Sequence, residues 1–323
     1  MNDEFALIAR LFAPLATHPA ARGLKDDAAL WTLAGPTVMT CDAIVEGMHF
    51  LPEDPIETVA QKALRVNFSD LAAKGAKPEG VLISLIWPQH RPAAEMAAFA
   101  AGLAEDLAAF DCALLGGDTA ATSGPLTVST MAFGRAFGGR SPARWDAVPG
   151  QDVWVTGTIG DGTLGLAAAR GRLTASADDA AFLVDRYRRP RPRCAFAETI
   201  AALAGSAMDV SDGLIADARK LAAASGLSVV LDPALAPLSP EARRLLASGE
   251  TSLAALLTGG DDYEILFTAD PPKAPALQAA ALRLGLGLTL IGHTAAGEGV
   301  RALLPDGQDL GREGGGFVHQ FGA

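Results

Sequence analysis

The stretch SAMDVSDGLIADARK, residues Ser206 to Lys220, places two aspartates, Asp209 and Asp212, between an apolar approach and a segment with helical spacing. The pattern predicts a buried strand, a short turn and a helix that starts near Leu214. An aspartate at the N-cap commonly satisfies the first amides of a helix, which explains one of the two acids. The other acid has no local explanation.

The same arrangement, an aspartate where an apolar segment meets a turn, recurs along the chain at Asp26, Asp27, Asp42, Asp70, Asp118, Asp209, Asp212, Asp261 and Asp262. Taken singly, each is explained by a cap or a turn. Acids at strand ends of α/β folds line ligand crevices, however, and two carboxylates about 4 Å apart repel by roughly 4 kcal/mol at an effective dielectric constant of about 20. Oxygen ligands without a His or Cys set favour Mg²⁺. The sequence therefore predicts a multi-metal site for a nucleotide or a phosphate.

The composition of the chain argues against several classes of protein. The chain has 323 residues, and its net charge of −11 argues against a nucleic-acid partner or an anionic membrane surface. Three widely spaced cysteines, Cys41, Cys112 and Cys194, suggest neither a disulfide framework nor a zinc site. The N-terminus does not resemble a signal peptide, and no apolar run approaches the roughly 18 residues of a membrane span. We expect a cytoplasmic protein.

Periodicity predicts two α/β domains, residues 1–145 and 146–323, with a turn-rich boundary. Strands are expected over residues 27–50, the first of them in AALWTLAG, residues 28–35. A helix is expected from residue 55 onward, followed by alternating strands and helices. The second half restarts with DVWVTGT, a glycine turn and a helix.

The glycine turn TGTIGDGTLGL spaces Gly160, Gly162 and Gly165 as G-x-G-x-x-G, which is typical of dinucleotide-binding folds. The acidic residue expected about 20 positions further on is missing, because that region is helical. An NAD(P) oxidoreductase is therefore a minor alternative. The chain has no G-x-x-x-x-G-K-[ST] motif.

The ordered motifs DDAAL, CDAIVEGMHF, KALRVNFSDLAAKGAKP, LLGGDT, VTGTIGDG, MDVSDGLIADA and GGDDYEILF resemble those of the thiamine-monophosphate kinase family, within the superfamily of aminoimidazole-ribonucleotide synthetase. The match runs nearly end to end. It implies a two-domain α/β fold of the α+β type, in which the N-terminal sheet domain pairs with a second subunit and an α/β domain follows. The implied assembly is a homodimer.

The resemblance also implies roles for residues. The family's magnesium ligands fall on Asp27, Thr40, Cys41, Asp42, Asp70, Asp118, Asp209 and Asp212. Contacts to ATP fall on Gly117, Asp118, Arg144 and Ser211, and contacts to thiamine monophosphate on His49, Asp261 and Phe317.

Three positions depart from the family pattern. Lys25 replaces the glycine of an early Gly-Asp-Asp. Cys41 stands where threonine is common, and its backbone carbonyl remains able to serve as a ligand. Asp261 stands where glutamate is common, which shortens its reach toward substrate by one methylene.

The implied reaction is direct, Mg²⁺-assisted transfer of the γ-phosphoryl of ATP to thiamine monophosphate, giving thiamine diphosphate. The acceptor phosphate, with a second pKa of about 6, is mostly ionised at neutral pH, so no residue is expected to act as a general base. Two alternatives stay open: another ATP-dependent synthetase of the superfamily, and a non-catalytic nucleotide-binding regulator.

Overall fold

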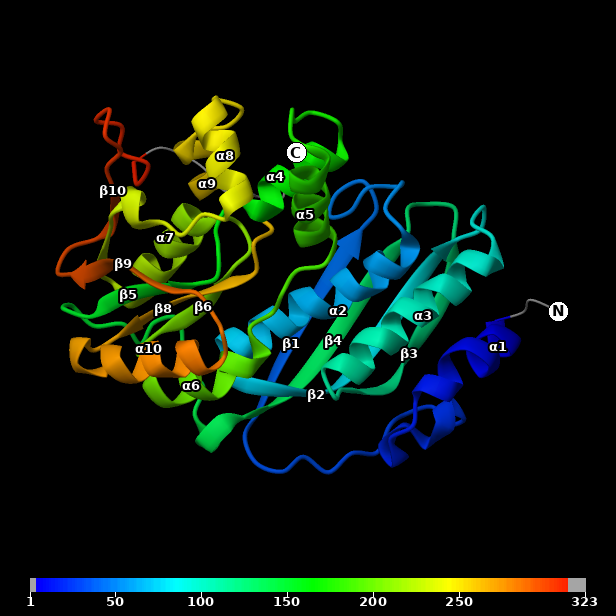
Figure 1. Cartoon of the computed structure of the whole chain (residues 1–323). Coiled ribbons are helices and arrows are strands. Elements are labelled where there is room, and N and C mark those ends of the chain that lie inside the picture. Colours follow the sequence, from blue (N-terminus) through cyan, green and yellow to red (C-terminus); the bar gives the residue numbers. More distant parts are fainter. Residues whose placement is uncertain (1–3, 313–323) are drawn as a thin grey trace, which may run out of the picture.

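The computed structural model describes residues 4–312 and contains two β-sheets, one from each half of the chain, with helices packed against them (Figure 1). The first sheet has the strand order β1-β4-β2-β3, with β2 and β3 parallel and the other neighbours antiparallel. Its half of the chain comprises α1 (Glu4–Leu7), β1 (Thr37–Val45), α2 (Ile56–Ala73), β2 (Ala76–Pro88), α3 (Ala93–Ala109), β3 (Ala113–Thr122) and β4 (Thr127–Ala136).

The second sheet has the order β10-β7-β9-β5-β8-β6 and is antiparallel except between β10 and β7. Its strands are β5 (Asp152–Thr156), β6 (Ala207–Val210), β7 (Ser228–Leu231), β8 (Glu264–Ala269), β9 (Leu288–Ala295) and β10 (Gly299–Ala302). Its helices are α4 (Asp161–Ala169), α5 (Ala177–Arg188), α6 (Ala197–Leu203), α7 (Leu214–Ser225), α8 (Pro240–Ser248), α9 (Leu253–Thr258) and α10 (Ala274–Arg283). This is the mixed α/β architecture that the resemblance implied.

Helix α2 joins the two halves. Together with α3 it covers one face of the first sheet (Figure 1), and its Leu64, Phe68 and Leu71 are fully buried there. Its last turn lies against the second half, where Ala72 and Ala73 belong to the same apolar cluster as Phe267 and residues of α6 and α10. Burial on both sides explains why this helix carries so few exposed residues. It therefore fixes side chains of the first domain next to those of the second.

The other face of the first sheet is open. Strand β1 is mostly accessible, and Met39 and Met131 are 64% and 41% exposed. Cys41 pairs with Met131 across β1 and β4, which places both on this face. Single exposed apolar residues are normal, but several on one sheet face indicate a contact surface.

The expectation of a strand in residues 28–35 is wrong. The segment is irregular, and Leu30 and Leu33 are 69% and 40% exposed. Strand β1 pairs only with β4, so the alternating residues of 28–35 have no ladder to join. The predicted boundary between residues 145 and 146 stays a prediction. None of the helices in the described part of the chain is long and apolar enough to cross a membrane.

Candidate active site

A hollow of about 640 Å³ lies between the two halves of the chain, a size within the roughly 300–1,000 Å³ of ligand sites. We call it the interdomain hollow. It is lined by many of the residues singled out in the sequence: Asp42, His49, Asp70, Arg144, Asp209, Ser211, Asp212 and Asp261.

The acids of the interdomain hollow come from both domains. Asp42 lies on β1 and Asp70 in the last turn of α2, whereas Asp209 lies in β6, next to its last residue, and Asp212 lies in the turn before α7. Asp42 is anchored by its amide, which donates to Asn67 Oδ1 at 3.0 Å. Thr40 is held nearby, since its hydroxyl donates to Asp70 Oδ2 at 2.5 Å.

Crowding of these carboxylates changes their protonation. Asp42 is accessible from the hollow, but the surrounding protein displaces bulk water, and this, with the charges of Asp70 and Asp212, raises its pKa to about 6. Burial, followed by the charges of Asp70 and Asp217, raises the pKa of Asp209 well above its ordinary value. Both shifts show that negative charge here costs free energy until a cation approaches.

The donor chemistry suits a hard cation. The hollow offers carboxylate and hydroxyl oxygens, the ligands that Mg²⁺ prefers. Among residues 4–312, no group of three or more His, Cys, Asp or Glu side chains is already arranged to hold a metal ion. Mg²⁺ commonly takes only one or two carboxylates and completes its shell with water and phosphate oxygens, so the residues fit an ion that arrives with a nucleotide.

The turn of SAMDVSDGL is organised by a third acid, which the sequence did not single out. The amides of Ser211 and Asp212 both donate to Asp217 Oδ2 at 3.0 Å. The helix N-cap is Gly213, with φ of 110°, and no side chain caps it. Asp217 thus reaches back from the first turn of α7 and holds the turn, while Asp209 and Asp212 line the hollow.

Cationic side chains also reach the interdomain hollow. Lys220 pairs with Asp212 and with Asp217, and Arg170 lines the wall. Arg144 has a buried Nε without a hydrogen-bond partner in the described residues. Its neighbour Lys74 donates to the carbonyl of Ala207, and burial together with the charge of Arg144 lowers the Lys74 pKa to about 8. The side of the interdomain hollow that carries these cationic side chains can therefore accept an anion.

The substrate end that the resemblance implies is formed by His49 and Asp261. His49 Nδ1 accepts the Val45 amide at 3.0 Å. Asp261 has a left-handed backbone, with φ of 71°, and its amide donates to the Ser211 carbonyl at 2.9 Å. Phe317 lies outside the described residues.

The remaining predicted residues lie elsewhere. Asp27, Cys41, Gly117 and Asp118 line a second hollow of about 550 Å³, between the N-terminal segment and residues from all four strands of the first sheet. Side chains alternate along a strand, so Cys41 points to the face opposite that of Thr40 and Asp42. Cys41 Sγ lies 3.7 Å from Ser129 Oγ there. The structure therefore divides the predicted ligand set between two hollows.

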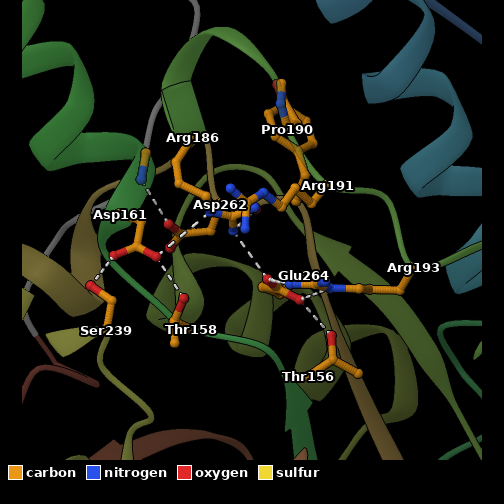
Figure 2. A network of polar contacts seen from close by, with 12 residues as sticks. Thr156, Thr158, Asp161, Arg186, Pro190, Arg191, Arg193, Ser239, Asp262 and Glu264 are labelled. Carbon is orange, nitrogen blue, oxygen red and sulfur yellow. Dashed lines mark hydrogen bonds and ion pairs between the residues drawn. The ribbon is translucent and has the colours of Figure 1, made fainter. Parts of the chain in front are cut away.

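A polar network around Arg186, which we call the Arg186 network, lies in the second half of the chain (Figure 2). Glu264, fully buried, accepts hydrogen bonds from Thr156 Oγ1 at 2.8 Å, from Arg186 Nη2 at 3.1 Å and from Arg193. Arg186 Nε also lies 3.6 Å from Asp161 Oδ2. Buried charges are tolerated only when they are paired in this way.

Asp262 links this network to the glycine turn. Its carboxylate accepts the amides of Gly160 at 2.8 Å and Gly162 at 3.1 Å, and burial raises its pKa. A side chain at Gly162 would collide with the Asp261 carbonyl, and one at Gly165 with the Leu183 carbonyl. The glycines therefore permit close packing. Because β5 has only antiparallel neighbours, no parallel βαβ unit forms here, which argues against the dinucleotide alternative.

Residues that the sequence analysis missed include Lys62, Asp217, Lys220 and Tyr263. The sequence does indicate that Lys62 is unusual. It falls on the apolar face of α2, between Val59 and Val66, and a charged side chain that is buried there requires a partner. In the sequence, Asp217 and Lys220 look like an ordinary exposed i, i+3 pair. Only the structure shows that Asp217 accepts the amides of the turn and that Lys220 pairs with Asp212.

We predict that Glu264→Gln will lower the free energy of unfolding by about 3–5 kcal/mol, because it removes the anion of Arg193 and leaves the buried Arg186 with Asp161 alone. Urea unfolding followed by circular dichroism measures this. The matched control Glu79→Gln removes a partly exposed pair with Arg135 and should cost less than about 1 kcal/mol. Equal effects of the two substitutions would contradict the structural role of the Arg186 network.

Comparison with known proteins places this geometry in a family. Residues 25–136 match the family model of the AIR synthase related protein N-terminal domain, and residues 148–304 that of the C-terminal domain. The chain is 45% identical to the thiamine-monophosphate kinase of Caulobacter vibrioides, over 98% of this chain and 90% of that protein.

Solved structures agree. The thiamine-monophosphate kinase of Stenotrophomonas maltophilia superposes with a TM-score of 0.83 at 38% identity, covering 93% of this chain and 96% of that one. AaThiL complexed with AMPPCP and TMP superposes with a TM-score of 0.79 at 30% identity, covering 98% and 97%. This chain belongs to the thiamine-monophosphate kinase family.

Proposed function

We infer that the protein transfers the γ-phosphoryl group of ATP to thiamine monophosphate, giving thiamine diphosphate and ADP. The observation that carries this conclusion is the convergence of Asp42 and Asp70 from one domain with Asp209 and Asp212 from the other, in one hollow of a family member. A solved relative complexed with AMPPCP and TMP supports the same pair of substrates.

The difficulty of this reaction is electrostatic, because two polyanions must meet. The acceptor phosphate is already largely ionised at neutral pH, since its second pKa is about 6, so proton removal is not the obstacle. We propose that Arg144 and Ser211 contact ATP and that His49, Asp261 and Phe317 contact thiamine monophosphate. These groups position the acceptor and the γ-phosphorus, which is the main protein contribution to phosphoryl transfer.

We propose that magnesium ions are held by Asp42, Asp70, Asp209 and Asp212, with Thr40 beside them. Bound Mg²⁺ supplies charge neutralisation and Lewis-acid polarisation of phosphate oxygens. For Asp27, Cys41, Gly117 and Asp118 the proposed metal and ATP contacts rest on the family resemblance, since these residues lie at the second hollow.

We also propose the domain division at residues 145/146, a cytoplasmic location and a homodimer. The open face of the first sheet, with its exposed Met39 and Met131, supports the dimer. Free Cys41, Cys112 and Cys194 are consistent with a reducing compartment.

The direct test is a purified-enzyme assay. With ATP and Mg²⁺, the protein should form thiamine diphosphate from thiamine monophosphate, and chelation of the metal by EDTA should abolish the product. ATP binding without any product would instead support a nucleotide-binding regulator.

Removal of single charges tests the metal ligands. Asp70→Asn and Asp212→Asn should each reduce kcat by about 100-fold or more, as expected when a ligand of the Mg²⁺ that offsets transition-state charge is lost. Steady-state kinetics at saturating ATP measures this. Asp178→Asn, at an exposed position of α5, is the matched control and should retain normal kcat. Near-normal rates for the first two variants at ordinary Mg²⁺ concentrations would refute their assignment.

The dimer proposal predicts that Met131→Arg will shift the protein to a monomer, because a buried unpaired guanidinium is costly at an apolar interface. Light scattering coupled to size-exclusion chromatography reports the mass. Leu282→Arg, at a residue of α10 that is 82% exposed, should leave the mass unchanged. If both variants keep the mass of the unsubstituted protein, the open face is not the interface.

A further inference from the structure

Lys62 is an unusual residue in this site, because it is a lysine on the buried face of α2. Its side chain is only 2% exposed. The ammonium donates to the His49 carbonyl at 2.9 Å and to Asp261 Oδ2 at 3.1 Å, and it lies 4.0 Å from the centre of the Tyr187 ring. An isolated ammonium is costly to bury, so these contacts account for its presence.

Two of those contacts are with the proposed substrate residues. Lys62 belongs to the first domain and Asp261 to the second, so their ion pair crosses between the domains. Lys62 also holds the backbone at His49, whose carbonyl has this ammonium as a donor. One buried cation therefore links two of the three residues proposed to contact thiamine monophosphate, His49 and Asp261.

The Asp261 carboxylate is constrained on both oxygens. Oδ2 accepts from Lys62, and Oδ1 accepts from the Tyr263 hydroxyl at 3.2 Å. Its backbone is also tied, through its amide, to Ser211 in the opening turn. The side chain is 28% exposed and lines the interdomain hollow. Its remaining lone pairs thus have a fixed direction toward a ligand.

The ion pair with Lys62 changes which groups of a substrate Asp261 can bind. Lys62 offsets the charge of the carboxylate, so a cationic ring in the substrate gains little Coulomb energy from it. An oriented carboxylate oxygen remains a strong acceptor for an N–H donor. The aromatic amine of thiamine monophosphate provides such a donor.

We propose that Lys62 is a positioning residue for thiamine monophosphate. It neutralises and orients Asp261, so that Asp261 binds the substrate as a directed hydrogen-bond acceptor, and it couples helix α2 of the first domain to the substrate end of the hollow. This inference rests on the proposed kinase function.

A double-mutant cycle tests the proposal. Lys62→Met should raise the KM for thiamine monophosphate about tenfold or more, and leave the KM for ATP within about twofold, since tenfold corresponds to the loss of roughly one good hydrogen bond. Asp261→Asn should have a similar effect. The double variant Lys62→Met/Asp261→Asn should be no worse than Asp261→Asn alone, because Lys62 acts through that carboxylate.

Control variants distinguish a loss of substrate positioning from a loss of folding. Lys77→Met removes an exposed pair with Asp111 and should leave both KM values unchanged. If Lys62→Met fails to fold, the double variant, which removes both charges together, is compared directly with Asp261→Asn. Tyr263→Phe, which removes the hydroxyl on Oδ1, should raise only the KM for thiamine monophosphate.

The outcomes are distinct. Additive effects in the cycle, or equal increases in the KM values for the two substrates, would overturn the positioning role. If the unsubstituted protein makes no thiamine diphosphate, the proposed function itself fails. If that protein is active and the KM values of Lys62→Met are normal, only the present inference fails.

Discussion

Helix α2 is packed on both of its sides, and the arrangement of the site depends on this packing. Phe68 and Leu71 bury the helix against the first sheet, while Ala72 and Ala73 bury its last turn against the second half of the chain. The small alanines allow the close approach. Lys62 and Asp70 are thus placed beside the hollow by a helix that packs against both halves of the chain.

Placing negative charge out of water costs free energy, and two acids of the proposed metal site bear this cost. The pKa values of Asp42 and Asp209 are raised by loss of water and by their neighbours. Burial also raises the pKa of Asp262, a carboxylate that supports the glycine turn. Glu264 has two arginines, and Asp262 has two backbone amides. Glu264 and Asp262 hold the loops in place through these partners. Among the acids proposed to receive metal, Asp212 pairs with Lys220 and Asp70 accepts the Thr40 hydroxyl. Structural support and proposed metal binding are thus served by different carboxylates.

Many residues of the interdomain hollow could be singled out from the sequence, because several short motifs in a fixed order identify a family more specifically than any one motif does. The acids at Asp42, Asp70, Asp209 and Asp212, with Arg144 and Ser211, do lie around one hollow. The structure contradicts the expected strand at residues 28–35, which has the alternation of a strand but no partner strand. Cys41 and Asp118 lie on the sheet face opposite that of Asp42, and their ligand roles stay predictions. Lys62 was missed because its partner, Asp261, is 199 residues away along the chain.

By itself, the sequence determined many of the strands and helices in both halves, their apolar faces and the aspartates near their ends, since these follow from local periodicity and turn chemistry. It also showed the two acids of SAMDVSDGL without explaining them. Only the tertiary structure decided that Asp217 serves the turn while Asp209 and Asp212 line the hollow, and that Lys62 holds Asp261. The physical reason is that hydrogen bonds and ion pairs between distant segments depend on packing in three dimensions, which residue spacing does not encode.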